Sequence, residues 1–387
     1  MTSALTQDNN LIAAPIAVAE LPAKRALDVS LYNVLAELGK VSLTGNGASE
    51  AIGRVPRVCA ESFAELAVRT RMTTPCARAF AHTGAAMPLP LADAVRASRA
   101  RAAISNGRVY GLARLAFPIL ARANIAAIAF KGPFQHRQIH GDPFFCRSGD
   151  LDLLVPREDF ARALRALEVG GFERREDSSR WWTSALGEVH LVHPQGGVID
   201  LHYRLQQPGC PPPRDLPRFL HEAVREQVGA VQIAVPTRGH AVLICALNLT
   251  KEFAHRRMSA RYAYDFAAGV LGMDVGQRRD FAELVQHQRL TGTVGFAAAL
   301  AGTIFDCELA LSVPLVRREL PSWATRAAVL AMVFDPEAPG TQWPRRRAIL
   351  WEMCSDAGSA GRAAEFAREA ARMMASEALR RSSTPSG

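Results

Sequence analysis

Short apolar runs interrupted by acidic residues fill the middle of the chain. Alternation of apolar and polar positions with a period of two is typical of β-strands with one buried face. The pattern predicts strands over residues 125–130, 150–155, 187–193 and 198–205. Turn-forming residues at 194–197 separate the last two runs, so these runs are predicted to form a β-hairpin.

Helical signals lie between the strand-like runs. A short helix is predicted from the Lys131-Gly132 turn to about His140. Pro156 is placed where proline is favoured, at the first position of a helix, and Gly170-Gly171 is predicted to stop that helix. Its apolar stripe indicates that it lies on the back of the sheet.

Apolar residues recur at helical spacing on both sides of this region. Their spacing from Leu27 to Leu38 predicts a helix up to Gly39, whereas residues 42–56 have the composition of a loop. Residues 91–123 are predicted to form one long helix, or two helices joined near Gly107 and Gly111. After a Pro-rich linker, the chain is helical in pattern to about residue 381.

The expected fold is therefore α+β: a small mixed β-sheet module flanked by N-terminal and C-terminal helical regions. We expect a loose tail first and a disordered tail last, because both ends lack a periodic apolar pattern. The predicted boundaries are 1–25 for the first tail, 26–123 for the N-terminal helices, 124–207 for the sheet module, 214–381 for the C-terminal helices and 382–387 for the last tail.

Composition adds only weak constraints on function. The chain has 387 residues, 49% of them hydrophobic, which is enough to bury a large core. Its net charge of +9 favours polyanionic ligands such as nucleotides or RNA. Arginine-rich composition is also a common coding bias of GC-rich genomes, so the charge alone does not indicate a partner.

The cysteine pattern and the hydropathy indicate a cytoplasmic protein. Seven cysteines are scattered without Cys-x-x-Cys spacing, so neither a zinc site nor a disulfide framework is indicated. No apolar stretch has the 18 or so residues of a membrane helix, and we expect no membrane partner. The apolar stretch at 11–23 lacks a preceding basic segment and is broken by Pro15 and Glu20, unlike a signal peptide.

Three aspartates in this sheet module carry the candidate chemistry. Asp150 and Asp152 are two residues apart in one predicted strand, so they share a face while the leucines between and after them pack behind. Asp200 lies in a later strand that the hairpin would bring beside them. An Asp-x-Asp motif alone more often lies at the start of a strand without a chemical role. The ordered set of a Lys-Gly turn, Asp-x-Asp and a third Asp instead indicates a metal-dependent nucleotidyl-transfer site.

Two carboxylates on one face repel each other unless a cation lies between them. Mg²⁺ suits this position because it takes oxygen ligands and completes its shell with water and substrate phosphates. A third carboxylate on an adjacent strand would complete a clamp for two metal ions. We therefore expect Asp150, Asp152 and Asp200 to be the catalytic and metal-binding residues, with two Mg²⁺ ions or, as a further candidate, Mn²⁺.

The same residues resemble a known family, the uncharacterised bacterial nucleotidyltransferases of the DNA polymerase β-like superfamily. The resemblance covers about residues 95–270, and its motifs are Lys131-Gly132, Arg147, residues 150–155 and residues 199–202. It implies that Asp150 and Asp152 hold the metals and that Asp200 binds one metal and helps to deprotonate the acceptor. Lys131-Gly132 stands where the superfamily usually has Gly-Ser, and Ser148-Gly149 is not at the position of that turn.

Further residues are candidates for binding the nucleotide. Lys131 would neutralise phosphate charge, with Gly132 permitting close backbone approach, although an exposed turn lysine is an equal alternative. His202 shares the strand face of Asp200, and a structural histidine is equally consistent with its position. Arg147 would bind a phosphate in a bidentate manner or pair with a carboxylate. The complete candidate set is Lys131, Gly132, Arg147, Ser148, His202 and Lys251.

Lys251 belongs to a basic segment that extends to Arg261 on a predicted helix. Such a segment would grip a triphosphate, but a solvated basic face is the commoner explanation. Asp265 follows one turn later and matches an aspartate of the resembling family. It is expected to anchor the arginines structurally.

Three hypotheses follow. The first is a Mg²⁺-dependent transferase that moves a nucleoside monophosphate from an NTP to an unidentified acceptor, such as a protein or peptide, a sugar or an RNA, and releases pyrophosphate. The second is a non-catalytic nucleotide-binding or nucleic-acid-binding module of the same fold, which a remote Asp200 would favour. The third is an Asp-x-Asp sugar-nucleotide transferase, in which Asp200 would not point at the same metal.

Overall fold

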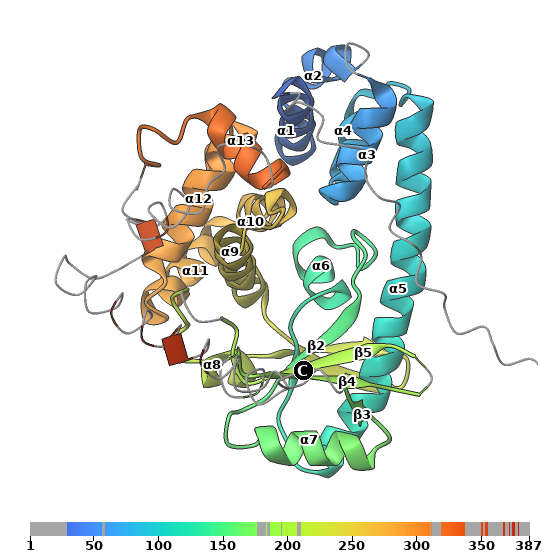
Figure 1. The fold of residues 1–387 in the computed structure, drawn as a ribbon, viewed down its shortest axis with the longest axis vertical. Coiled ribbons are helices and arrows are strands. Elements are labelled where there is room, and N and C mark those ends of the chain that lie inside the picture. The colour runs from blue at the N-terminus through green and yellow to red at the C-terminus, as the bar shows by residue number, and fades with distance from the viewer. Residues whose placement is uncertain are drawn as a thin grey trace, which may run out of the picture.

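A mixed sheet of five strands is formed by the predicted apolar runs (Figure 1). The strands follow the order β1-β2-β5-β4-β3 across the sheet. They are β1 (Ile128–Ala129), β2 (Asp150–Leu154), β3 (Glu173–Arg174), β4 (Glu188–Val192) and β5 (Val198–His202). The computed structural model describes residues 29–55, 59–175, 183, 186–194, 196–206, 210–309, 311 and 319–336, with residues 350, 353–354, 367, 371, 374–375 and 378.

Strand direction determines which residues become neighbours. β2 and β5 are parallel, whereas β1–β2, β5–β4 and β4–β3 pair antiparallel. In the parallel register Asp152 lies opposite Asp200, and in the β4–β5 hairpin His190 lies opposite Asp200. The predicted hairpin and the placement of Asp200 beside the Asp-x-Asp strand are therefore confirmed.

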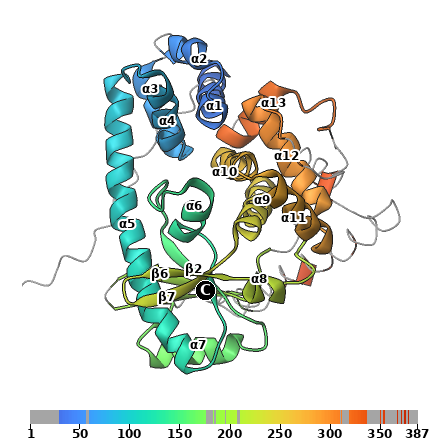
Figure 2. The same cartoon turned by 180° about the vertical axis from the view of Figure 1, so that it is seen from behind.

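Helices cover both faces of the sheet. α6 (Pro133–His140) and α9 (Arg238–Ala254) lie on one side, and α7 (Phe160–Val169) lies on the other, as Figures 1 and 2 both show. Leu151 and Leu153 alternate with the aspartates and are buried, which matches the period of two in the sequence. α7 lies behind the sheet as predicted, but it begins at Phe160 rather than at Pro156, because residues 156–159 form a turn.

The N-terminal helices differ from the sequence prediction in two places. The first helix runs through Gly39 to Thr44, and part of the expected loop over 42–56 is a short helix. Of the two alternatives for residues 91–123, the single long helix is confirmed, since it continues unbroken through Gly107 and Gly111. The elements are α1 (Val29–Thr44), α2 (Ala48–Arg54), α3 (Ala60–Arg69), α4 (Thr73–Thr83) and α5 (Leu89–Arg122). Tertiary packing overrides local composition here, since Ala51 and Val55 of the expected loop are buried.

The C-terminal part is not entirely helical. Two strands, β6 (Val224–Val228) and β7 (Val231–Val235), form an antiparallel hairpin that the sequence prediction missed. Gly229 in its turn has a φ of 60°, a conformation that glycine adopts without strain. The helices are α8 (Pro217–His221), α9, α10 (Ala260–Leu271), α11 (Val275–His287), α12 (Thr291–Phe305) and α13 (Arg326–Phe334).

α9 is the central helix of the hydrophobic core. Every residue from His240 to Thr250 is buried, so the helix has no exposed face over three turns. A single cluster of buried apolar side chains continues from α1 through the sheet to α13. The predicted tails at 1–25 and 382–387, and most of the helical prediction beyond residue 336, lie outside the described residues.

None of the helices within the described ranges is both long and apolar enough to pass through a membrane.

Gly39 permits the close approach of α1 to α12. A Cβ atom at this position would lie 2.6 Å from Cε1 of Phe305, which is fully buried. We expect Gly39→Ala to destabilise the protein by about 1–3 kcal/mol through overpacking, despite the better helix propensity of alanine. The midpoint of urea unfolding measures the change. Gly53→Ala in α2 is the matched control, because no atom lies within 4 Å of its Cβ position. If Gly39→Ala instead increased the stability of the protein, α1 and α12 could not be packed as closely as described.

Candidate active site

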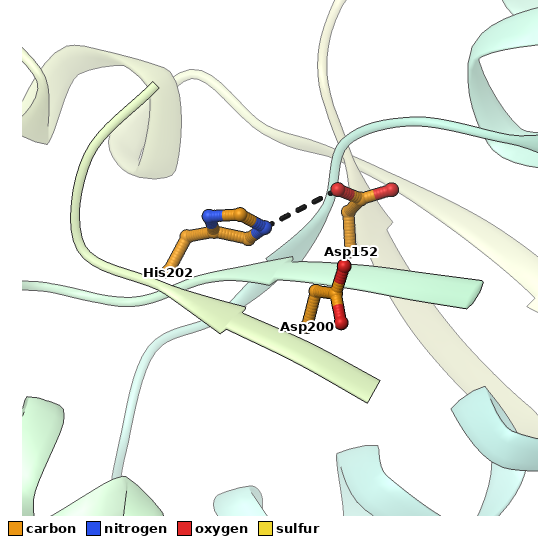
Figure 3. A group of neighbouring side chains, drawn as sticks. All are labelled: Asp152, Asp200 and His202. Carbon is orange, nitrogen blue, oxygen red and sulfur yellow. Dashed lines mark ion pairs between the residues drawn. The ribbon is translucent and has the colours of Figure 1, made fainter. Parts of the chain in front are cut away.

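The paired strands β2 and β5 place the aspartates at the centre of the sheet. Asp152 is buried, and Asp150 and Asp200 are partly buried on the same face. One ligand atom from each of Asp152, Asp200 and His202 lies within 4.8 Å of the others (Figure 3). Residues that are fifty positions apart in the chain thus converge on one point.

Lys131 enters this site from the turn that follows β1. Its Nζ atom lies 2.5 Å from Oδ1 of Asp152, and little of its side chain is exposed. The exposed turn lysine that was the alternative reading is therefore wrong. Gly132 has a φ of 64°, and a Cβ atom there would lie 2.9 Å from Oγ of Ser148. Glycine is required because it lets this turn approach the segment that leads into β2.

His202 links two acidic residues. Its Nε2 atom lies 3.2 Å from Oδ1 of Asp152 (Figure 3), and its Nδ1 atom lies 3.4 Å from Oε2 of Glu188. The Nε2 atom is fully buried but lacks a hydrogen bond of adequate geometry. A buried ring nitrogen with an unused lone pair or proton beside two carboxylates has the chemistry of a metal ligand or a ligand-orienting group.

Two further residues of the site were missed by the sequence analysis. His190 on β4 places its Nδ1 atom 2.5 Å from Oδ1 of Asp200, and its Nε2 atom lies 3.8 Å from Oε1 of Glu188. Glu188 therefore lies between two histidines that each contact a candidate aspartate. Glu188 and His190 are two residues apart in β4, so both lie on one face of the sheet. The register of the β4–β5 hairpin brings that face beside Asp200, and this register is the signal that could have identified both residues.

Burial and charge separate the pKa values of the two strand-β2 carboxyls. Burial, together with the carboxylates of Asp152 and Asp200, raises the pKa of Asp150 to about 7. Burial acts in the same direction on Asp152, but the Lys131 ammonium and the His202 imidazole outweigh it and hold the pKa of Asp152 well below its usual range. Asp152 is therefore ionised at neutral pH, whereas Asp150 loses its proton only at about pH 7.

The other predicted nucleotide-binding residues lie around the aspartates at different degrees of burial. Lys251 of α9 lines a small pocket with Lys131, Glu188 and His202, and burial and the charge of Lys131 lower its pKa. Arg147 is exposed. The backbone of Ser148 is held by α5, since its N–H donates to Asn106 and its carbonyl accepts from Ser105. No observation tests the roles of these residues in binding, and they stay predictions.

Asp265 anchors the basic segment only in part. Its Oδ2 atom lies 3.1 Å from Nη2 of Arg261, and its Oδ1 atom lies 2.9 Å from Nε2 of His140. Arg261 in turn lies 2.7 Å from Nε2 of His136. This buried group joins α10 to α6, the helix that begins directly after Gly132. The expected anchoring role is confirmed for Arg261, which does not contribute to a solvated basic face.

The residues present fit a divalent metal ion. Two carboxyl groups and one imidazole nitrogen converge, and burial together with the charges of Asp152 and Asp200 raises the pKa of the neighbouring Asp150. Hard oxygen donors with one nitrogen suit Mg²⁺ or Mn²⁺. The metal group defined by geometry is Asp152, Asp200 and His202, whereas the sequence predicted Asp150, Asp152 and Asp200; the role of each as a ligand stays a prediction.

The chain was compared with known proteins. A model of a family described as "Uncharacterised nucleotidyltransferase" matches residues 57–306. This range contains all the strands described above and the helices from α3 to α12. No curated protein matches the sequence.

The raised pKa of Asp150 predicts a dependence of stability on pH. The folded chain binds this proton more tightly than the unfolded chain, so the stabilising contribution is complete below about pH 4 and is lost as the pH rises to about 7. In metal-free buffer we expect Asp150→Asn to increase the free energy of unfolding at pH 8 by an amount on the order of 1–3 kcal/mol, with little change at pH 4.

Urea unfolding at the two pH values measures this difference. The control is Asp280→Asn, because the Asp280 side chain is 73% exposed. Equal effects of the two substitutions at pH 8 would show that the carboxylates do not repel each other in the folded chain.

Proposed function

The chain belongs to the uncharacterised nucleotidyltransferase family, and from this premise we propose that it is a metal-dependent enzyme that transfers a nucleoside monophosphate from an NTP. An oxygen or nitrogen atom of the acceptor attacks the α-phosphorus, the bond from that phosphorus to the bridging oxygen breaks, and pyrophosphate leaves. The transfer consumes no other reactant.

The pairing of Asp152 with Asp200 across β2 and β5 is the observation that carries this proposal. A binding module that has lost catalysis has no need of the third carboxylate, and a remote Asp200 would have favoured it. A sugar-nucleotide transferase would need only the Asp-x-Asp at its metal. Both alternatives are disfavoured because ligand atoms of Asp152 and Asp200 lie within 4.8 Å of each other.

We propose that Asp150, Asp152 and Asp200 hold two Mg²⁺ ions, for which Mn²⁺ is a substitute. Bound Mg²⁺ supplies positive charge that neutralises the carboxylates and polarises the phosphoryl oxygens. His202 orients Asp152, and His190 orients Asp200, through the contacts at 3.2 and 2.5 Å.

The basic residues of the site are proposed to bind the triphosphate. Lys131 is a compact cation beside the aspartates, and Lys251 lines the same small pocket. Asp200 accepts the proton that the acceptor loses as it attacks the phosphorus. Asp200 suits this step because its contact with His190 fixes the orientation of its carboxyl group.

The acceptor is proposed to be a protein or peptide, a sugar or an RNA, because each offers a hydroxyl group or other nucleophile. The reaction is expected in the cytoplasm, where NTPs are present and where cysteines without a disulfide framework are usual.

Removal of one aspartate is expected to abolish transfer. With each radiolabelled NTP, Mg²⁺ and an extract of the host cells, we expect the wild-type chain to label an acceptor and Asp152→Asn or Asp200→Asn to reduce labelling at least about 100-fold. EDTA should have the same effect, and added Mg²⁺ should restore labelling. Electrophoresis and thin-layer chromatography of the products show whether the acceptor is a macromolecule or a small molecule.

Asp280→Asn is the matched control, since it removes the same charge from an exposed position of α11. Urea unfolding of each variant excludes loss of the fold. Wild-type turnover by Asp152→Asn would refute the assignment, whereas metal-dependent NTP binding without labelling of any acceptor would favour the binding module.

Lys251 is expected to act in binding rather than in chemistry. Lys251→Met retains most of the apolar side chain and removes the cation, so we expect the Kd for NTP to rise about tenfold, which corresponds to about 1.4 kcal/mol. Isothermal titration calorimetry in Mg²⁺ measures the change. Lys40→Met is the control, because Lys40 pairs with Asp306 between α1 and α12. An unchanged Kd in Lys251→Met would place the triphosphate elsewhere.

A further inference from the structure

The exposed face of α5 carries an unusual concentration of positive charge. This helix has six arginines, one aspartate and no lysine or glutamate, which gives it a formal charge of +5, from six minus one. The whole chain has a net charge of +9. One helix of 34 residues therefore accounts for more than half of the net charge of the chain.

Five of these arginines have no acidic partner. Arg96 pairs with Asp93, but no ion pair or hydrogen bond of the other five guanidinium groups is found within the part of the chain that the structure describes. All five are exposed: Arg99, Arg101, Arg108, Arg114 and Arg122. With 3.6 residues per turn, Arg101, Arg108 and Arg122 lie within about 60° of one another around the helix, whereas Arg99 and Arg114 lie on another side of its exposed surface. We call Arg101, Arg108 and Arg122 the α5 arginine face.

Acidic residues are missing from most of α5. Elsewhere in the described part of the chain some arginines pair with acidic residues, as Arg54, Arg137 and Arg162 do, and others are exposed without an ion pair, as Arg147 and Arg165 are. What distinguishes α5 is that no acidic residue follows Asp93 to its end at Arg122. Unpaired like charges along one helix repel each other, so they weaken the free protein unless a polyanion neutralises them.

The dimensions of the face suit a phosphate backbone. From Arg101 to Arg122 the helix advances by about 32 Å, a length over which a stacked nucleic-acid strand carries about nine phosphates. Guanidinium groups bind phosphates in a bidentate manner, which lysine does not. The helix is visible over its full length along one side of the molecule in Figures 1 and 2.

A membrane surface is a poorer match for this face. An interfacial helix presents a continuous apolar stripe to the lipid. The large apolar side chains exposed on α5 are Leu89, Ile104 and Leu115, each separated from the next by more than two turns. They do not form a stripe.

The opposite side of α5 connects the face to the candidate active site. Asn106 is fully buried and donates to the carbonyls of Pro143 and Cys146, while its own Oδ1 atom accepts from Ser148. These residues form the segment that enters β2 at Asp150. Arg101 and Arg108 lie within two turns of Asn106 along α5, on the side of the helix that faces away from it.

We propose that the α5 arginine face binds the phosphate backbone of a single-stranded nucleic acid. This surface is separate from the carboxylate site, and binding there requires no turnover. Arginines that contact phosphates position a strand without reading its sequence, so the affinity depends on salt and only weakly on base composition.

The test measures binding of a fluorescent 20-nucleotide RNA of mixed sequence to the full chain by anisotropy, without NTP, between 50 and 250 mM KCl. The test variant is Arg101→Gln/Arg108→Gln, and the control is Arg165→Gln/Arg279→Gln, which removes the same charge from exposed positions on α7 and α11. Glutamine retains helix propensity, and urea unfolding checks that each variant is folded.

We expect the wild type to bind with an affinity that falls steeply with salt. In the test variant the magnitude of the slope of log K against log[KCl] should fall by about 1.4, from about 0.7 for each lost phosphate contact, while the control keeps the wild-type slope. Arg101→Lys/Arg108→Lys should keep most of the slope because it keeps the charge. DNA of the same sequence tells whether the strand is RNA or DNA, and binding of either supports the proposal.

Three outcomes would overturn the proposal: no binding of either nucleic acid by the wild type, an equal loss of affinity in the test and control variants, or arginine-dependent binding to vesicles of phosphatidylserine without binding to nucleic acid. Failure of this test would leave the carboxylate site untouched, because labelling by the wild type does not require the α5 arginine face.

Discussion

Repulsion between buried carboxylates is the constraint that organises this structure. Parallel pairing of β2 with β5 sets Asp152 opposite Asp200, and Asp150 lies on the same face. Carboxylates that share a partly buried site cannot all remain ionised without nearby positive charge. Lys131 supplies part of it beside Asp152, while burial and the carboxylates of Asp152 and Asp200 still raise the pKa of Asp150 to about 7. The remaining demand is the physical reason to propose metal ions.

The surrounding fold holds these charged groups in place. Gly132 lets the Lys131 turn approach Ser148, and Asn106 of α5 fixes the segment that carries Ser148 into β2. The buried pair of Arg261 and Asp265 ties α10 to α6, which starts at that same turn. Hydrogen bonds and one close contact, rather than apolar packing alone, therefore fix where the ammonium of Lys131 meets the carboxylate of Asp152. A site that stores electrostatic strain needs such support, because local relaxation would otherwise separate the charges.

The sequence predicted the elements whose pattern is local and missed those that tertiary contacts decide. The period of two revealed β2 and β5, and the order of Lys131, Asp152 and Asp200 indicated one site, with support from the family resemblance. The helix α2 was missed because its Gly- and Ser-containing sequence is typical of a loop. Glu188 and His190 were missed because only the cross-strand register of β4 with β5 joins them to Asp200. A one-residue shift of that register would turn both to the other face.

The helix α5 shows how one element can serve both the site and a surface. Its buried side needs polar residues at a single place, where Asn106 and Ser105 hold the entrance to β2, and is otherwise apolar. Its exposed side is free of that requirement, since solvent tolerates either sign of charge. Mixed charges would be the stabilising choice on such a helix, because pairs of opposite sign at a spacing of four attract each other. The chain instead carries +5 on α5, a cost that folding does not explain and that the proposed polyanionic partner would offset.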